Sequence, residues 1–78
     1  MSVVDVRDDI ARGEEPFDRI MQAVAALDVE EALVVINVFE PVPLYGVLAR
    51  QGFTHETIRT PDGDWQVTFR RSGAAVPH

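Results

Sequence analysis

The chain has 78 residues, of which 46% are hydrophobic and 26% charged, with no cysteine and a net charge of −6. This length makes one domain with a small core, and the lack of cysteine excludes disulfides, thiolate metal sites and a cysteine nucleophile. Residues 1–40 contain ten acids and three arginines, a local charge of −7 that repels nucleic acid and anionic lipid. We therefore expect a single domain over residues 1–71, followed by a flexible C-terminal tail over residues 72–78.

The first half of the domain predicts a strand, a loop and a helix. Residues 2–7 alternate around Val4 and Val6, as a short strand does. Residues 8–15 are predicted to form a polar loop, and Pro16 then stands at the favoured first position of a helix. Apolar residues recur after it at helical spacing and form one stripe: Phe17, Ile20, Met21, Val24 and Leu27. We interpret this stripe as the helix face that packs on the core.

The second half predicts a buried strand, a second helix and a hairpin. Residues 32–39 are continuously apolar, which indicates a central strand or burial on both faces. Pro43 opens the second helix and Gly52 ends it. Residues 53–60 predict a third strand, and a Pro-Asp-Gly-Asp turn leads to a fourth over 65–70, where apolar and polar residues alternate.

This order, β-α-β-α-β-β, predicts an α/β (α+β) two-layer sandwich. Right-handed crossovers put both helices on one face of the sheet. The other face is then open, and the apolar second side of the strand over 32–39 predicts a partly covered apolar patch there, or a packing partner.

Two places in the chain are candidates for a site. Asn37 ends the buried strand just before a helix, so it either orients a ligand at the carboxyl edge of the sheet or caps the Pro-x-Pro turn. Arg7, Glu14 and Glu15 cluster near the first helix start, as a solvated acidic loop or a surface for docking a partner. Adjacent glutamates do not point the same way on a helix, which argues against a catalytic pair.

The residue pattern gives no sign of catalysis or of a bound cofactor. His55 and His78 share no metal-ligand spacing, and no Ser-His-Asp arrangement or Gly-rich phosphate loop is present in the sequence. We predict no catalytic residue, no cofactor and no metal. The residues after Met1 do not show the basic and then apolar pattern of a signal peptide. The longest apolar run is too short to span a bilayer, and we therefore expect a cytoplasmic protein.

Several short motifs, each of which has little specificity alone, occur together in a recognisable order. They are Val4-Asp5-Val6-Arg7, Pro16, Glu31-Ala32-Leu33, Asn37, Pro41-x-Pro43-Leu44-Tyr45, Leu48-Ala49-Arg50-x-Gly52-Phe53, Glu56, Trp65-x-Val67 and Arg70-Arg71. With them the chain resembles the TusA-like (SirA-like) superfamily, most closely its cysteine-less bacterial branch, domain of unknown function 2249. The resemblance implies a mixed four-stranded sheet with two helices on one face and the last strand antiparallel to the rest.

The chain departs from the family pattern at two positions. The sulfur-carrier members begin the first helix with Cys-Pro-x-Pro, whereas this chain has Gly13 in place of the cysteine, before Glu14, Glu15 and Pro16. Sulfur transfer by that mechanism is therefore excluded. The cysteine-less branch carries Asn-Asp-His-Asp-Pro after the second strand, whereas this chain has Phe39 in place of the histidine. Any metal or proton chemistry of that histidine is lost here.

Two functions remain open from the sequence. The first is a non-catalytic accessory or protein-interaction module, for which the family context implies a link to redox, sulfur or nitrogen-oxide metabolism. Its partner would be another protein, or a second copy of the chain on the open sheet face, and not nucleic acid or a membrane. The alternative is a domain that binds a small ligand, an anion or a metal, at the corner between the second strand, the second helix and the first helix start. The candidate surface comprises Arg7, Glu14, Glu15, Asn37 and Glu40.

Overall fold

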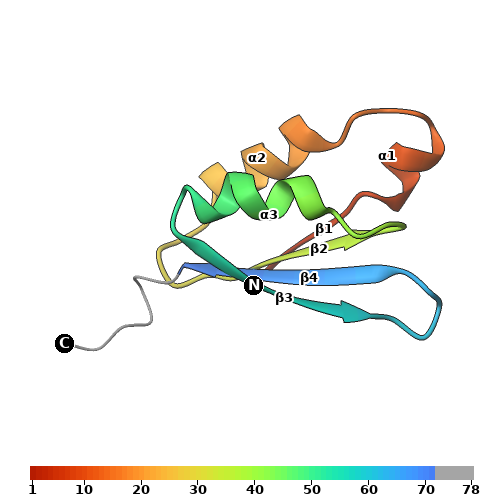
Figure 1. Cartoon of the computed structure of the whole chain (residues 1–78). Helices are drawn as coiled ribbons and strands as arrows, with labels where there is room; N and C mark the ends of the chain where they lie inside the picture. Colours follow the sequence, from red (N-terminus) through yellow and green to blue (C-terminus); the bar gives the residue numbers. More distant parts are fainter. Residues whose placement is uncertain (72–78) are drawn as a thin grey trace.

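The computed structural model describes residues 1–71, which form one mixed four-stranded sheet and three helices (Figure 1). The strands are β1 (Ser2–Asp5), β2 (Leu33–Asn37), β3 (Phe53–Arg59) and β4 (Trp65–Arg71), and the helices are α1 (Arg7–Ala11), α2 (Phe17–Ala25) and α3 (Val42–Ala49). The strand order is β1-β2-β4-β3; β1 and β2 are parallel, and β4 is antiparallel to both of its neighbours. The predicted fold class and strand directions are confirmed. The predicted tail, 72–78, lies outside the described residues.

The core lies between the sheet and the two longer helices, α2 and α3, which cover the same face (Figure 1). Its buried members alternate along the strands and follow one stripe of each helix: Val4, Val6, Ile20, Val24, Leu27, Leu33, Val35, Leu44, Leu48, Phe53, Val67 and Phe69. The stripe predicted for α2 is therefore the core face, except that Phe17, at its beginning, is 40% exposed. None of the helices in residues 1–71 is long and apolar enough to cross a membrane.

Helix α1 is a correction to the sequence prediction, which placed a polar loop over residues 8–15. The helix is only five residues long and polar, so no apolar stripe could reveal it. Asp8 and Asp9 lie in its first turn, at the positive end of the helix dipole. Asp9 is buried, and its carboxylate lies 2.6 Å from Nη1 of Arg19 in α2. A contact between residues ten positions apart thus fixes this helix, and local sequence does not show it.

The predicted hairpin turn and helix end are present. Gly63 has φ +87°, and its N–H donates to the Thr60 carbonyl inside the turn that joins β3 to β4. Gly52 has φ +88° and follows α3 shortly after its last turn. Both are conformations that glycine adopts at no steric cost, which explains its use at these positions.

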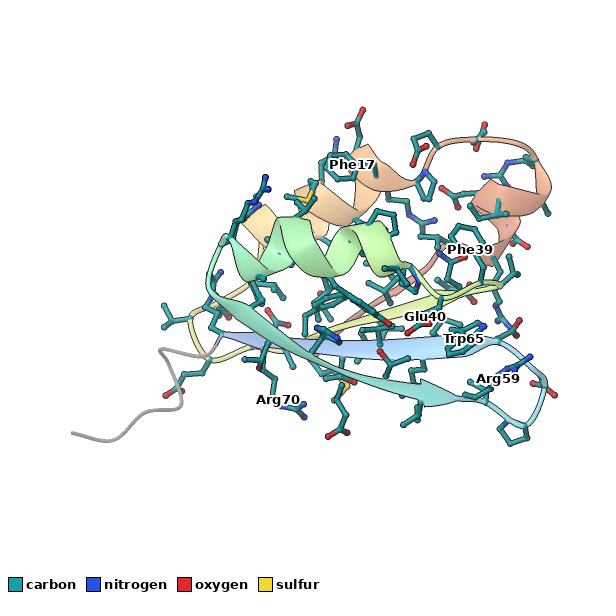
Figure 2. The ribbon with its side chains drawn as sticks, in the orientation of Figure 1. Phe17, Phe39, Glu40, Arg59, Trp65 and Arg70 are labelled. Atoms are coloured by element: carbon teal, nitrogen blue, oxygen red, sulfur yellow. The ribbon has the colours of Figure 1, made fainter. Side chains whose placement is uncertain are left out.

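The face of the sheet opposite the helices is open and mixed in character. Arg70 lies on this face (Figure 2), together with exposed Val3 and Ile58. Val34, between Val3 and Thr68 in the sheet, is nevertheless only 5% exposed. The apolar second side of β2 that the sequence indicated is thus largely covered by its neighbours.

Candidate functional site

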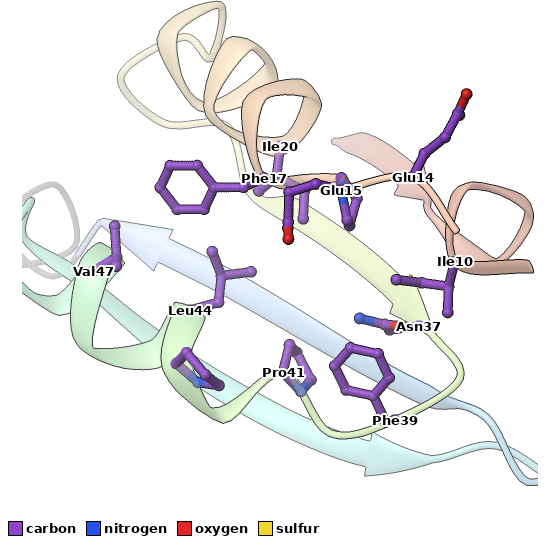
Figure 3. Close-up of a pocket in the computed structure, with 12 residues that line it drawn as sticks. Ile10, Glu14, Glu15, Phe17, Ile20, Asn37, Phe39, Pro41, Leu44 and Val47 are labelled. Atoms are coloured by element: carbon purple, nitrogen blue, oxygen red, sulfur yellow. The ribbon is translucent and has the colours of Figure 1, made fainter. Parts of the chain in front are cut away.

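A pocket of about 330 Å³ opens at the carboxyl end of β2, where the first turns of α2 and α3 face each other (Figure 3). This size is at the small end of the range for ligand sites in proteins. The wall is mostly apolar and is formed by Ile10, Glu14, Glu15, Pro16, Phe17, Ile20, Asn37, Phe39, Pro41, Pro43, Leu44 and Val47. Three of the five candidate site residues, Glu14, Glu15 and Asn37, therefore lie around one cavity.

Prolines shape both helix starts at the pocket. Pro16 is the N-cap of α2 and Pro41 the N-cap of α3, with Pro43 in the first turn. Proline has a fixed φ and no N–H, so it enters a helix start without loss of a hydrogen bond. Neither N-cap supplies a side-chain hydrogen bond, and the amide groups of both first turns are left uncapped by side chains.

Asn37 forms the polar floor of the pocket. Its side chain is 2% exposed, and its Oδ1 accepts a hydrogen bond of 2.7 Å from the Val38 N–H. This bond fixes the orientation of the amide, because a backbone N–H needs an acceptor and only Oδ1 is one. The Nδ2 group is therefore directed into the cavity (Figure 3), where nothing within residues 1–71 accepts its hydrogen bonds. The Asn37 oxygen thus bonds the next residue, Val38, and not the turn at Pro41 and Pro43, and the Asn37 nitrogen faces the pocket.

Glu14 and Glu15 point apart, as expected for neighbours. The Glu14 carboxylate is directed away from the cavity (Figure 3) and pairs with the Arg12 guanidinium at 2.9 Å. The Glu15 carboxylate is directed into the cavity, near Leu44, and forms no ion pair with any described residue. One negative charge therefore faces the apolar pocket from the loop before α2.

Arg7 lies outside the pocket and has a structural role. Its guanidinium pairs with Asp5 at 2.7 Å and with Asp64 at 2.8 Å. Asp5 ends β1 and Asp64 lies in the turn before β4, so Arg7 joins the end of β1 to this turn at one end of the sheet. The hydrogen bonds from Arg7 lower the pKa of the Asp5 carboxyl.

A pH dependence follows from the Asp5 pair. Because the pKa of Asp5 is depressed in the folded chain, the pair stabilises the fold above the unfolded pKa of about 3.9, and this contribution is lost as the pH falls through the folded pKa. We expect Asp5→Asn to lower the urea midpoint at neutral pH and to have no effect at a pH below the folded pKa. Thr54→Val, on the exposed edge strand, is the control. A wild-type-minus-variant difference that is independent of pH would contradict the assignment.

Glu40 also lies outside the pocket, on the opposite side of the loop from Phe39 (Figure 2). The Tyr45 hydroxyl donates to its Oε2 at 3.0 Å, and Thr57 in β3 is 2.6 Å from the same hydroxyl. The Tyr45 ring stacks on His55 with centroids 3.8 Å apart. Burial raises the pKa of Tyr45. These contacts attach α3 to the edge strand β3, and they separate Glu40 from Asn37 although only two residues lie between them.

Nine of the twelve pocket residues were not among the candidate site residues named from sequence. Ile10 belongs to α1, which the sequence did not predict. From sequence, Phe39 is the replacement of a family histidine and, with Tyr45 and Trp65, an aromatic residue that either lines a shallow pocket or packs in the core; in the structure it lines the pocket and is 49% exposed. An exposed phenylalanine after a buried strand is a usable signal, because large apolar side chains left in water often mark binding surfaces. Nowhere in residues 1–71 do three or more His, Cys, Asp or Glu side chains gather as a metal site would require.

The fold and the pocket define a small two-layer α/β sandwich domain with a recess at the carboxyl end of its central parallel strand. A family model described as an uncharacterized conserved protein, DUF2249, matches residues 3–71, and the chain belongs to that family. Comparison with curated proteins and with solved structures gave no significant match.

Proposed function

We propose that this domain is a non-catalytic binding module that takes up a small, largely apolar ligand in the pocket at the carboxyl end of β2. The observation that carries the proposal is Asn37, a buried amide whose nitrogen faces the pocket without a partner in residues 1–71. Among residues 1–71 only Arg71 Nε is both closed off from solvent and without a hydrogen-bond partner, so water in the pocket reaches the Asn37 Nδ2 group. A ligand that accepts this hydrogen bond would replace that water.

The chemical character of the wall supports binding rather than catalysis. The only titratable side chains on it are Glu14 and Glu15, and only Glu15 is directed inward. The wall includes no hydroxyl, thiol, imidazole or amine, so a nucleophile and a base cannot be assigned there. The exposed rings of Phe17 and Phe39 add an apolar rim that a bound molecule would cover.

Ligand screening by NMR tests this function. A chain of 8.7 kDa is small enough for resolved amide spectra, and a library of small amides, amines, thiols and anions can be tested by chemical-shift perturbation. The proposed TusA-like relationship directs the first compounds to redox, sulfur and nitrogen-oxide metabolism. We expect binders to shift Ile10, Asn37, Leu44 and Val47 together. A complete screen without a binder, or shifts confined to the open sheet face, would refute the proposal.

A matched pair of variants strengthens the screen. Val47 lines the pocket, whereas Val42, in the same helix, does not line it and is 56% exposed. Val47→Phe should fill the cavity and reduce ligand affinity at least about tenfold, a difference of about 1.4 kcal/mol. Val42→Phe should leave the affinity unchanged. Equal affinities for the two variants would place the ligand elsewhere.

A second candidate is the protein-interaction module, with a second copy of the chain on the open sheet face. The specific observation is that Val3 and Ile58 are 58% and 50% exposed on this face. Analytical ultracentrifugation of the wild type and of Ile58→Lys distinguishes the cases. A dimer that the substitution dissociates supports this candidate, and a monomer at high concentration rules it out.

A further inference from the structure

We propose that the pocket selects small amides with an apolar substituent and rejects anions. This inference rests on the proposed binding function and adds the ligand class. In the proposed complex the ligand carbonyl accepts a hydrogen bond from Asn37 Nδ2, the ligand N–H donates to the Glu15 carboxylate, and the apolar substituent lies against Ile20 and Leu44.

The orientation of Asn37 determines the first half of this recognition. Because Oδ1 is used by the Val38 N–H, the group that faces the cavity is a donor, and it can bind only an acceptor. The side chain is 98% buried, so bulk water competes with a ligand for it only through the pocket. A neutral carbonyl oxygen satisfies this donor and brings no charge into an apolar cavity.

Glu15 determines the second half of the recognition, the contact with the ligand N–H. Its carboxylate is directed into the pocket and is not neutralised by an arginine, in contrast to Glu14, which pairs with Arg12. A carboxylate accepts hydrogen bonds and repels negative charge. The uncapped first turn of α2 would otherwise favour an anion, but Glu15 lies just before that turn, and its full charge exceeds the partial charge of a helix end. The ligand is therefore a hydrogen-bond donor on this side.

The rest of the wall requires an apolar body. Ile20 and Leu44 are buried and Pro16 and Pro41 are buried at the two helix starts, so no further polar partner is offered deep in the cavity. A molecule that carries a carbonyl and an N–H on one side and a hydrocarbon on the other matches this distribution, and the pocket volume of about 330 Å³ limits it to a small one.

Three compounds with the same aromatic body separate the contributions. Phenylacetamide has both the carbonyl and the N–H, phenethylamine has only a cationic donor, and phenylacetate has acceptors and a negative charge. We expect phenylacetamide to bind at least about tenfold more tightly than either of the others, as the loss of about one hydrogen bond implies. Binding is followed by NMR titration of the full chain, with the Asn37 side-chain NH₂ resonances as the direct readout.

Variants assign the two polar contacts separately. Asn37→Asp retains the acceptor for the Val38 N–H and removes the donor to the pocket. It should lower the affinity for phenylacetamide at least about tenfold and should not lower the affinity for phenethylamine. Glu15→Gln should raise the affinity for phenylacetate and lower it for phenethylamine. Glu14→Gln, whose side chain points away from the pocket, is the matched control and should change neither. If Asn37→Asp does not fold, the shift of the wild-type Asn37 NH₂ resonances on titration decides the same question.

The outcomes separate this inference from the proposed function. The ligand class is overturned if phenylacetate binds as tightly as phenylacetamide, or if Glu15→Gln leaves the affinities for phenylacetate and phenethylamine unchanged. The proposed binding function is not overturned by either result, provided that the pocket binds other compounds. Phenylacetamide binding that shifts the Asn37 NH₂ resonances and follows the predicted order supports both. The absence of any binder at the pocket in the wider screen would overturn both.

Discussion

Replacing Phe69 with alanine is expected to remove about 3–5 kcal/mol of unfolding free energy, the range for truncating a fully buried aromatic residue. Phe69 is 1% exposed, stands on the interior strand β4, and lies beside the rings of Tyr45 and His55. A domain of 78 residues has a total stability of only roughly 4–12 kcal/mol. The variant should therefore be partly or wholly unfolded at 25 °C.

Urea unfolding measures this effect, with fluorescence of the single tryptophan, Trp65, as the probe. Ile58→Ala is the control, because Ile58 is 50% exposed on the open face, and we expect it to lose less than about 1 kcal/mol. A loss below about 1 kcal/mol for Phe69→Ala would mean that the ring is not packed in the core as described.

Replacing Arg19 with methionine is expected to cost about 2 kcal/mol, because it leaves the buried Asp9 carboxylate with one distant partner. Asp9 is 7% exposed, with Arg19 at 2.6 Å and Arg12 at 3.8 Å. The pair joins α1 to α2, and α1 carries Ile10 into the wall of the pocket. We therefore expect the substitution to loosen that wall as well as to destabilise the fold.

A double-mutant cycle with Asp9→Asn tests the assignment. The two substitutions together should cost less than the sum of the single ones, because the neutral side chain no longer leaves a buried charge. Amide hydrogen exchange gives a second readout, since the Glu14 N–H donates to the Asp9 carbonyl at 2.9 Å and should exchange faster when α1 detaches. Additive costs and unchanged exchange would show that the ion pair does not hold the helix.

Helices and strands whose apolar residues recur at regular spacing could be predicted from the sequence, whereas an element held by contacts distant in the sequence could not. The alternation around Val67 and the stripe through Ile20 and Val24 placed β4 and α2 within a few residues, because both patterns follow the burial that forms them. Helix α1 has no such pattern. Its position depends on the contact between Asp9 and Arg19, which exists only once the chain has folded.

The candidate site, like the fold, could be predicted only in part: the direction of Asn37 follows from its strand, and the directions of the loop residues do not follow from the sequence. Asn37 shares its strand face with Leu33 and Val35, so the period of two already directs its side chain toward the helices. Glu15 and Glu40 lie in loops, where no period determines direction; one turns into the pocket and the other toward Tyr45. Sequence spacing alone therefore grouped Glu40 with Asn37, and the structure places them in different contacts.

The interior position of β4 has a consequence for how the chain assembles during synthesis. Among the described strands, β3 is hydrogen-bonded only to β4, and β4 is the last to leave the ribosome. Until residues 65–71 emerge, β3 has no neighbour in the sheet and the parallel pair of β1 and β2 has one unpaired edge on its inner side. The nascent domain therefore completes its sheet in one late step, and premature termination before residue 65 exposes two further edges, one of β2 and one of β3, that favour aggregation.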